Sequence, residues 1–344
     1  MNTRETERIV WVDCLKGFVI ILMVLGHCIQ FGSGNDYFSA GMYFYDTVFR
    51  LIYSFHMPCL MLIAGAFFSG TVEKKDFWRN LLIRTVIPLM IWSAVPVIIE
   101  TVKALCYKRF SFPVVRDLSM IFLKYYWFLW ALLIMSVTVR IVHGFFNDNL
   151  ALYIILGAVI LLLPDVLNTE LYKFMYPFFV IGYLFNRKKR DLSDILKYRA
   201  FWIPGLIALY ILLFIFFDTE TFVYISGTCI RTFRQLLTDA HRYAIGLIGS
   251  LIAVCLARFS FPYINKYFPS CVRLLSYFGR ISLLIYLIDI LIDSFLLPVI
   301  TYSFRPGYPT AFLETSLILL LCAVIGAFIG KVPLLNRLLL GGRT

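Results

Sequence analysis

The side chains best suited to chemistry lie in one apolar stretch near the start of the sequence. The stretch from Trp11 to Phe31 contains Asp13, Lys16 and His27, which a plain membrane anchor does not need. An α-helix turns by about 100° per residue, so Lys16 and His27 lie within roughly 20° of one face and Asp13 within roughly 40° of it. Lys16 and His27 are then about 16 Å apart along the helix. Because imidazole titrates near neutral pH, proton transfer is the chemistry that this face offers.

A second histidine is expected close to the first. The motif Phe55-His56-Met57-Pro58 lies inside the next apolar stretch, which must run back across the membrane. Both imidazoles then fall in the same half of the membrane and face one cavity, because ionisable side chains in spans usually face the bundle interior or water. Pro58 leaves a backbone carbonyl free beside His56. Taken alone, either histidine equally fits a hydrogen bond to a neighbouring helix.

Basic side chains near one membrane surface are candidates for binding phosphate. A lone lysine such as Lys16 usually extends its ammonium group to water. Arg79 and Arg84 follow the second apolar stretch, and Arg84 falls more than one turn inside the third. Arginine forks and lysine ammonium groups hold phosphates well. The excess of basic residues in cytoplasmic loops explains Lys74 and Lys75 fully, and Arg84 less well.

Aromatic and acidic side chains mark two later stretches. Trp127 and Trp130 open the fourth stretch, where they fit either a membrane interface or one wall of a sugar pocket. Tyr286 lies in the ninth stretch and is a further candidate for substrate contact. Asp289 and Asp293 follow it, one helical turn apart. Two acids in one apolar segment indicate a polar bundle interior.

The composition indicates a polytopic membrane protein rather than a soluble domain. The 344 residues are 61% hydrophobic and 15% charged, and their mean hydropathy is +0.84. The net charge of +12 is explained by basic clusters that fall on one side of a membrane, so we expect no nucleic-acid partner. Eight cysteines without a CxxC pair argue against disulfides and metal sites, and we expect no metal.

Hydropathy predicts an all-α bundle of about ten transmembrane helices that forms a single membrane domain over residues 1–344. The predicted spans are 11–31, 46–69, 80–103, 120–142, 148–164, 174–186, 201–217, 240–258, 276–299 and 311–330. Most basic clusters then fall on one side, so both termini are expected to be cytoplasmic. The longest stretch between spans on the other side, 218–239, has room for a short interfacial helix.

These motifs resemble acyltransferase family three, whose members are integral membrane O-acyltransferases of sugars and cell-envelope polymers. The family carries a basic residue and, after ten further residues, a histidine in its first span, as Lys16 and His27 do. The other matching elements are Phe55-His56-Met57-Pro58 with Ala64-Gly65, the basic segment from Arg79 to Pro88, Trp127-Phe128-Leu129, Gly182-Tyr183, and Gly279 with Ser282, Tyr286 and Leu287. Ala64 replaces the usual Ser, and Asp289 stands where many members have His. Because no soluble extension follows residue 330, the chain is similar to stand-alone members such as fucose 4-O-acetylase.

The resemblance implies transfer of an acetyl or other short acyl group from acyl-CoA to a hydroxyl of a sugar, glycolipid or cell-envelope glycan. The donor would be acetyl-CoA on the cytoplasmic side of a bacterial cytoplasmic membrane. His27 would be the general base, oriented by Asp13 or His56. A covalent acyl group on His27 is equally open.

The resemblance also assigns the binding residues. Lys16, Arg79 and Arg84 would hold the CoA phosphates or stabilise developing negative charge. The acceptor would contact Trp127, Trp130 and Tyr286. Two other functions compete with this one. Intramembrane charges also mark secondary transporters and flippases of polar or lipid-linked solutes, and a structural scaffold would leave all these residues freely replaceable.

Overall fold

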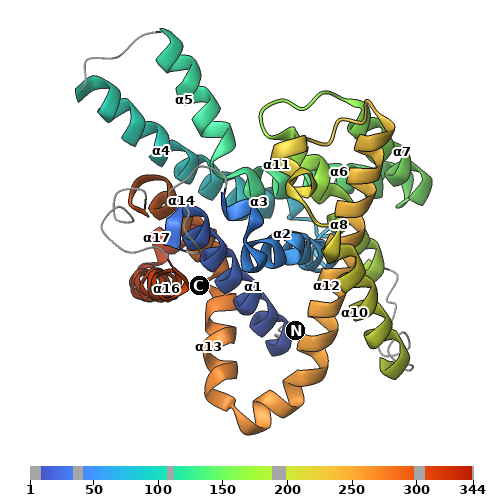
Figure 1. Cartoon of the computed structure of the whole chain (residues 1–344). Helices are drawn as coiled ribbons and strands as arrows, with labels where there is room; N and C mark the ends of the chain where they lie inside the picture. The colour runs from blue at the N-terminus through green and yellow to red at the C-terminus, as the bar shows by residue number, and fades with distance from the viewer. Residues whose placement is uncertain (1–8, 34–41, 107–111, 188–198, 298–306, 343–344) are drawn as a thin grey trace.

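The computed structural model describes residues 9–33, 42–106, 112–187, 199–297 and 307–342, and helices form its framework throughout (Figure 1). The α-helices are α1 (Val10–Cys28), α2 (Thr47–Phe68), α3 (Phe77–Leu81), α4 (Ile87–Cys106), α5 (Phe112–Lys124), α6 (Trp127–Phe146), α7 (Leu150–Leu162), α8 (Thr169–Arg187), α10 (Arg199–Ile215), α11 (Val223–Ser226), α12 (Phe233–Tyr267), α13 (Pro269–Arg280), α14 (Ser282–Phe295), α16 (Tyr308–Lys331) and α17 (Pro333–Leu340). Short 3-10 or π segments are η1 (Ile29–Ser33), η2 (Met42–Tyr45), η3 (Leu82–Val86) and η5 (Thr219–Thr221). The all-α prediction is confirmed.

Six helical segments in the described part of the chain are long and apolar enough to cross a membrane, and α13 with α14 gives a seventh if the bent pair counts as one span. The six run over Val10–Phe31, Thr47–Phe68, Phe77–Cys106, Trp127–Phe146, Phe233–Tyr267 and Tyr308–Lys331. The protein is therefore an integral membrane protein. Helices also cover the other predicted spans, but α7 has 13 residues, or about 20 Å, against roughly 30 Å of hydrocarbon.

The segment containing α1 is the most enclosed of these six. Of its apolar window, 67% is buried inside the protein, against 28% to 50% for the other five. Figure 1 shows α1 passing through the middle of the molecule, with α13, α2 and α16 around it. The helix that carries Lys16 and His27 is thus walled by protein over most of its length.

Two glycines let α1 and α13 lie against each other. A Cβ on Gly17 would be 1.9 Å from the carbonyl oxygen of Leu275, and one on Gly279 would be 1.8 Å from that of Asp13. These distances are far below van der Waals contact, so only glycine permits the approach. Gly279, which the sequence offers only as part of a motif, and Gly17 act here as packing residues.

Two further glycines let α2 and α8 pack equally closely. A Cβ on Gly65 would be 2.0 Å from the carbonyl oxygen of Phe179, and one on Gly182 would be 2.0 Å from that of Leu62. Next to Gly182, the Tyr183 hydroxyl donates to the carboxylate of Asp148 at 2.9 Å. This crossing fixes the helix that carries His56 against its neighbour.

Adding one methyl group at the α2–α8 crossing is expected to destabilise the protein severely. In Gly182→Ala the helices must separate because the new Cβ meets backbone atoms, and the free energy of unfolding should fall by at least about 2 kcal/mol. Gly205→Ala is the matched control, since no atom lies within 4 Å of its Cβ position in α10. That variant should be neutral or stabilised by up to about 1 kcal/mol. Thermal unfolding in detergent, followed by tryptophan fluorescence, measures both; equal midpoints would contradict this packing.

The predicted ninth span, 276–299, is broken in the structure. α13 ends at Arg280, α14 begins at Ser282, and their axes differ by 70°. The break lets α13 follow α1 while α14 turns to reach the far end of the same helix. The predicted span is therefore present as a bent pair of helices and not as one continuous helix, and Gly279, at the end of α13, packs there against α1.

The predicted fourth span, 120–142, is also divided. α5 ends at Lys124 and α6 begins at Trp127. The backbone at Tyr126 is not helical, and its hydroxyl donates to the carbonyl of Leu287 in α14 at 3.1 Å. The start of α6 is thus held beside α14.

Candidate active site

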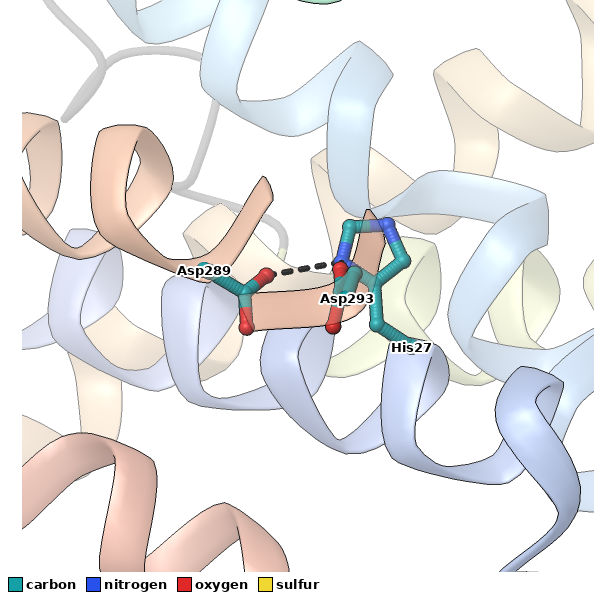
Figure 2. Close-up of side chains that lie close together, drawn as sticks. All are labelled: His27, Asp289 and Asp293. Atoms are coloured by element: carbon teal, nitrogen blue, oxygen red, sulfur yellow. Dashed lines mark hydrogen bonds and ion pairs between the residues drawn. The ribbon is translucent and has the colours of Figure 1, made fainter. Parts of the chain in front are cut away.

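His27 lies against two carboxylates at the end of α1 (Figure 2). Its Nδ1 atom is 2.7 Å from Asp289 Oδ2 and 2.6 Å from Asp293 Oδ2. Both acids come from α14, and their side chains are 0% and 6% exposed, whereas the imidazole is 20% exposed. The two acids lie one turn apart on one helix face. The bend before α14 brings this face next to His27.

The carboxylates favour one placement of the ring proton of His27. An ionised carboxylate only accepts hydrogen bonds, so Nδ1 is the donor to an ionised Asp289, and Asp293 Oδ2 lies at ion-pair distance from the same nitrogen. A neutral imidazole has one N–H group, and Nε2 therefore keeps its lone pair. Figure 2 shows Nε2 on the side of the ring turned away from both acids. The arrangement is compatible with a base whose ring is held by carboxylates.

The same three side chains offer ligand atoms that lie within 4.8 Å of one another, which a metal ion also accepts. Asp289 Oδ1 and Asp293 Oδ1 are buried and have no hydrogen-bond partner among the described residues. The nitrogen–oxygen distances of 2.6 and 2.7 Å are hydrogen-bond lengths. Tetrahedral zinc ligands would stand roughly 3.3 Å apart. The geometry fits a hydrogen-bonded triad more closely, and the absence of a metal stays a prediction.

A cavity of about 390 Å³, called the upper cavity below, opens beside His27. Its wall includes His27, His56, Trp127, Asp293 and Tyr286. Its polar lining also includes side chains that hydrogen-bond sugar hydroxyls well, namely Gln30, Ser54, Asn168, Glu170 and Thr221. Aromatic rings mixed with such polar groups suit a carbohydrate.

His56 faces the upper cavity without contacting the acids of α14. Its Nδ1 atom lies 2.8 Å from the carbonyl oxygen of Ile52, one turn earlier in α2, and is the donor to it. The ring of Tyr53 lies 6.4 Å from the His27 ring and 4.8 Å from the His56 ring. The two histidines therefore share one cavity, while acids from α14 hold His27.

A second cavity of about 370 Å³, called the lower cavity below, lies toward the Lys16 end of α1. Lys16 and Arg280 are the cationic side chains on its wall, and the remaining lining is mostly apolar. The Lys16 ammonium group donates to Asp13 Oδ1 at 3.3 Å. Asp13 lies fourteen residues before His27, roughly 21 Å along the helix. Asp13 therefore does not orient His27, and that expectation is corrected in favour of Asp289 and Asp293.

Three sequence-predicted residues lie away from both cavity linings. Arg79 and Arg84 are exposed, and the backbone of Arg84 packs against Gly341 after α17. Trp130 packs near Phe122, with ring centroids 6.1 Å apart. Arg280 is the arginine that joins Lys16, and sequence reasoning assigned it no role.

Arg242 is a second residue that the sequence did not single out as functional. It is 1% exposed and lines the upper cavity. Its guanidinium donates to the carbonyl of Gly227 at 2.7 Å, to that of Glu220 at 3.1 Å, and to the Ser226 hydroxyl. These bonds hold the segment with η5 and α11 over the cavity. A buried arginine near the start of an apolar run was the available signal.

Asp165 holds the other side of the same segment. Its carboxylate accepts from the backbone N–H groups of Thr228 and Cys229 at 2.8 and 3.0 Å and pairs with Lys173 at 2.7 Å. Burial acts to raise the pKa of Asp165, but the hydrogen bonds from Lys173 and the two N–H groups outweigh burial and lower the pKa. The carboxylate is therefore ionised at neutral pH.

The chain is similar to known proteins over most of its length. The model of the acyltransferase domain matches residues 9–335, nearly the whole chain. Nodulation protein NolL of Sinorhizobium fredii is 30% identical over 227 residues, which are 63% of this chain and 60% of that protein. Nodulation protein NolL of Mesorhizobium japonicum is 30% identical over 181 residues, 50% of this chain and 46% of that protein. The chain thus matches less than two thirds of either relative. No solved structure matches it significantly.

Proposed function

Because the chain belongs to acyltransferase family three, a family of membrane O-acyltransferases, we propose that it transfers acetyl or another short acyl group from acyl-CoA to a sugar hydroxyl. The observation that supports the reaction best is the contact of His27 Nδ1 with Asp289 and Asp293. This contact leaves Nε2 as a base at the wall of a cavity with room for a sugar.

In the proposed reaction, His27 Nε2 removes the proton of the acceptor hydroxyl as its oxygen attacks the thioester carbonyl carbon. The carbon–oxygen bond forms, and the carbonyl electrons move to an oxyanion. The oxyanion then collapses, the carbon–sulfur bond breaks, and the CoA thiolate takes the proton back from the imidazolium. Asp289 and Asp293 stabilise the transient positive charge on His27, because two carboxylates lie beside it.

A covalent variant uses the same atoms. In it, Nε2 attacks the thioester itself, CoA leaves as the thiolate, and the acceptor hydroxyl attacks the acyl-imidazole. His56, on the same cavity wall, is then the candidate base for the second step. Labelled acyl groups that remain on the protein without acceptor, and disappear in His27→Ala, would favour this route.

We propose that the donor enters the lower cavity. Lys16 supplies a fixed positive charge on its wall, held by Asp13, and Arg280 supplies another. Phosphate oxygens are suited to both. Arg79 and Arg84 are proposed to attract the nucleotide from the exposed surface nearby, where they lie outside the cavity lining.

The acceptor is proposed to occupy the upper cavity. Trp127 and Tyr286 line it and offer aromatic faces to a sugar ring. Trp130 is proposed to support that wall from behind. A sugar, glycolipid or envelope glycan is the acceptor class that we propose.

The proposed topology places both termini and the lower cavity in the cytoplasm of a bacterium and the upper cavity across the cytoplasmic membrane. About ten helices would cross the membrane, with α7, α8 and α10 added to the longer ones. The chain would act as one membrane domain over residues 1–344, in contact with lipid. Arg4 and Arg8, part of the predicted cytoplasmic charge, lie outside the described residues.

Labelled acetyl-CoA tests this function directly. Purified protein in nanodiscs is incubated with acetyl-CoA and a panel of sugars and glycolipids that includes 4-nitrophenyl fucoside. We expect a base-labile labelled ester, an equal amount of free CoA thiol, and no loss of rate with EDTA. Solute movement into proteoliposomes without thioester consumption would instead support a transporter or flippase.

A further inference from the structure

The upper and lower cavities share two lining residues, Met57 of α2 and Tyr286 of α14. We propose that these two side chains form the partition through which the acyl group passes, and that their size determines which acyl chain lengths are transferred. The inference rests on the proposed function, because it requires that the donor bind in the lower cavity and react in the upper one.

The positions of the charges require such a passage. Lys16 and Arg280 line the lower cavity, whereas His27 and Asp293 line the upper one. Lys16 and His27 are separated by about 16 Å along α1. A donor whose phosphates stay near Lys16 must therefore reach His27 with its flexible thioester arm. On its way the arm passes Met57 and Tyr286, the two residues that line both cavities.

Tyr286 is the fixed side of the partition. It is 5% exposed, and its hydroxyl accepts a hydrogen bond from the backbone N–H of Phe128 at 3.2 Å. This N–H belongs to the first turn of α6, where no carbonyl of the same helix is available to accept it. The rings of Tyr126 and Phe128 lie edge-on to Tyr286, with centroids 6.1 and 5.8 Å away. The phenol ring is thus held on three sides.

Met57 is the adaptable side. It is 8% exposed and directly follows His56 in α2. Methionine is unbranched and has three rotatable bonds, so it can adjust to a small group passing beside it. The lining below it is apolar, with Leu60, Ile63 and Ala64 on the same helix. An acyl chain is compatible with that surface, while each added methylene must find room beside Met57.

Acyl-CoA donors of increasing length test the partition. The initial rate of CoA thiol release is measured with acetyl-, butyryl- and hexanoyl-CoA in the presence of 4-nitrophenyl fucoside and of the glycolipid panel. One methylene in a tight apolar site changes kcat/KM by about 10-fold or more. We expect Met57→Ala to raise the hexanoyl-to-acetyl ratio of kcat/KM at least 10-fold, and Tyr286→Leu to raise it in the same direction.

Met61→Ala is the matched control. Met61 lies one turn further along α2, is 0% exposed, and does not line either cavity. Met61→Ala removes the same atoms as Met57→Ala, so it measures the effect of a truncated methionine on kcat/KM without opening the partition. The hexanoyl-to-acetyl ratio of kcat/KM in Met61→Ala should stay at the wild-type value. Tyr286→Phe keeps the ring and should also keep the ratio, although its acetyl transfer is expected to slow because Phe128 N–H loses its acceptor.

The outcomes separate the inference from the function on which it rests. If wild type consumes acetyl-CoA but Met57→Ala and Tyr286→Leu, both folded by gel filtration, keep the wild-type ratio, the partition is wrong while the proposed function stands. If wild type consumes no thioester with any donor, the proposed function falls and the inference falls with it. A changed ratio in Met61→Ala as well would also overturn the inference, because it would trace the effect to α2 packing.

Discussion

His27→Ala is expected to lower acyl transfer by at least 100-fold while the protein still folds and inserts. General acid–base catalysis contributes about 10² to 10⁴ in rate, and in the proposed mechanism His27 both removes and returns the proton. The imidazole is 20% exposed at a cavity wall, and gel filtration of the variant checks that α1 and α14 still pack when Asp289 and Asp293 lose this partner. The measurement is the rate of labelled ester formation from acetyl-CoA in nanodiscs.

His143→Ala is a suitable control for that variant. His143 lies in α6, contacts Asp148 at 2.8 Å, and does not line either cavity. It should retain transfer within a few-fold. Near-normal turnover by His27→Ala would remove His27 from the mechanism, whatever the other variants do.

The double variant Asp289→Asn/Asp293→Asn is expected to lose at least 100-fold in kcat. An amide can donate a hydrogen bond to Nδ1, which moves the ring proton to Nε2 and removes the base. In a protease triad the equivalent change costs about 10⁴ in kcat. Each single variant should lose less, because the other carboxylate remains within hydrogen-bond distance of Nδ1.

A pH profile separates this positioning role from simple loss of packing. The acids hold the base, so the double variant should shift the pH dependence of kcat, whereas a merely structural change should lower kcat equally at every pH. Asp13→Asn is the matched comparison, since its carboxylate pairs with Lys16. It should raise the KM for acetyl-CoA and leave the pH profile unchanged. The reverse pattern would restore Asp13 as the partner of His27.

Single-sequence reasoning located the helices better than their contacts. The apolar pattern predicted the all-helical fold and the approximate position of α1, α2 and α16, because membrane helices are marked by composition over some 20 residues. It missed the breaks at Ile281 and Tyr126. Both lie inside segments that hydropathy assigns to single spans, and at both the chain contacts another helix, α1 at Gly279 and α14 at Tyr126.

The contacts within the site were also harder to predict from sequence than the positions of its residues. The helical period placed Lys16 and His27 on one face, and each lines a cavity. The period cannot tell how two helices are rotated against each other, so the contact of His27 with Asp289 was invisible. The available signals were the two acids one turn apart in an apolar segment and the acid at a position where the family often has His.

Several glycines in the family motifs serve helix packing rather than chemistry. Gly65, Gly182 and Gly279 appear in sequence only as parts of family patterns, yet each is required by a carbonyl oxygen within about 2 Å of its absent Cβ. They position α1 and α2, the helices that carry His27 and His56, against their neighbours. Part of the resemblance is therefore explained by helix packing.

The most direct test of the central claim is the tautomer of His27, measured by nitrogen-15 NMR of histidine-labelled protein in lipid. The chain has four histidines, and the His27→Ala spectrum assigns the signal. In the proposed mechanism, Nδ1 is protonated and Nε2 is unprotonated in wild type at neutral pH, and the proton moves to Nε2 in the Asp289→Asn/Asp293→Asn variant. An Nε2-protonated ring in wild type, unchanged by removing the two acids, would contradict it.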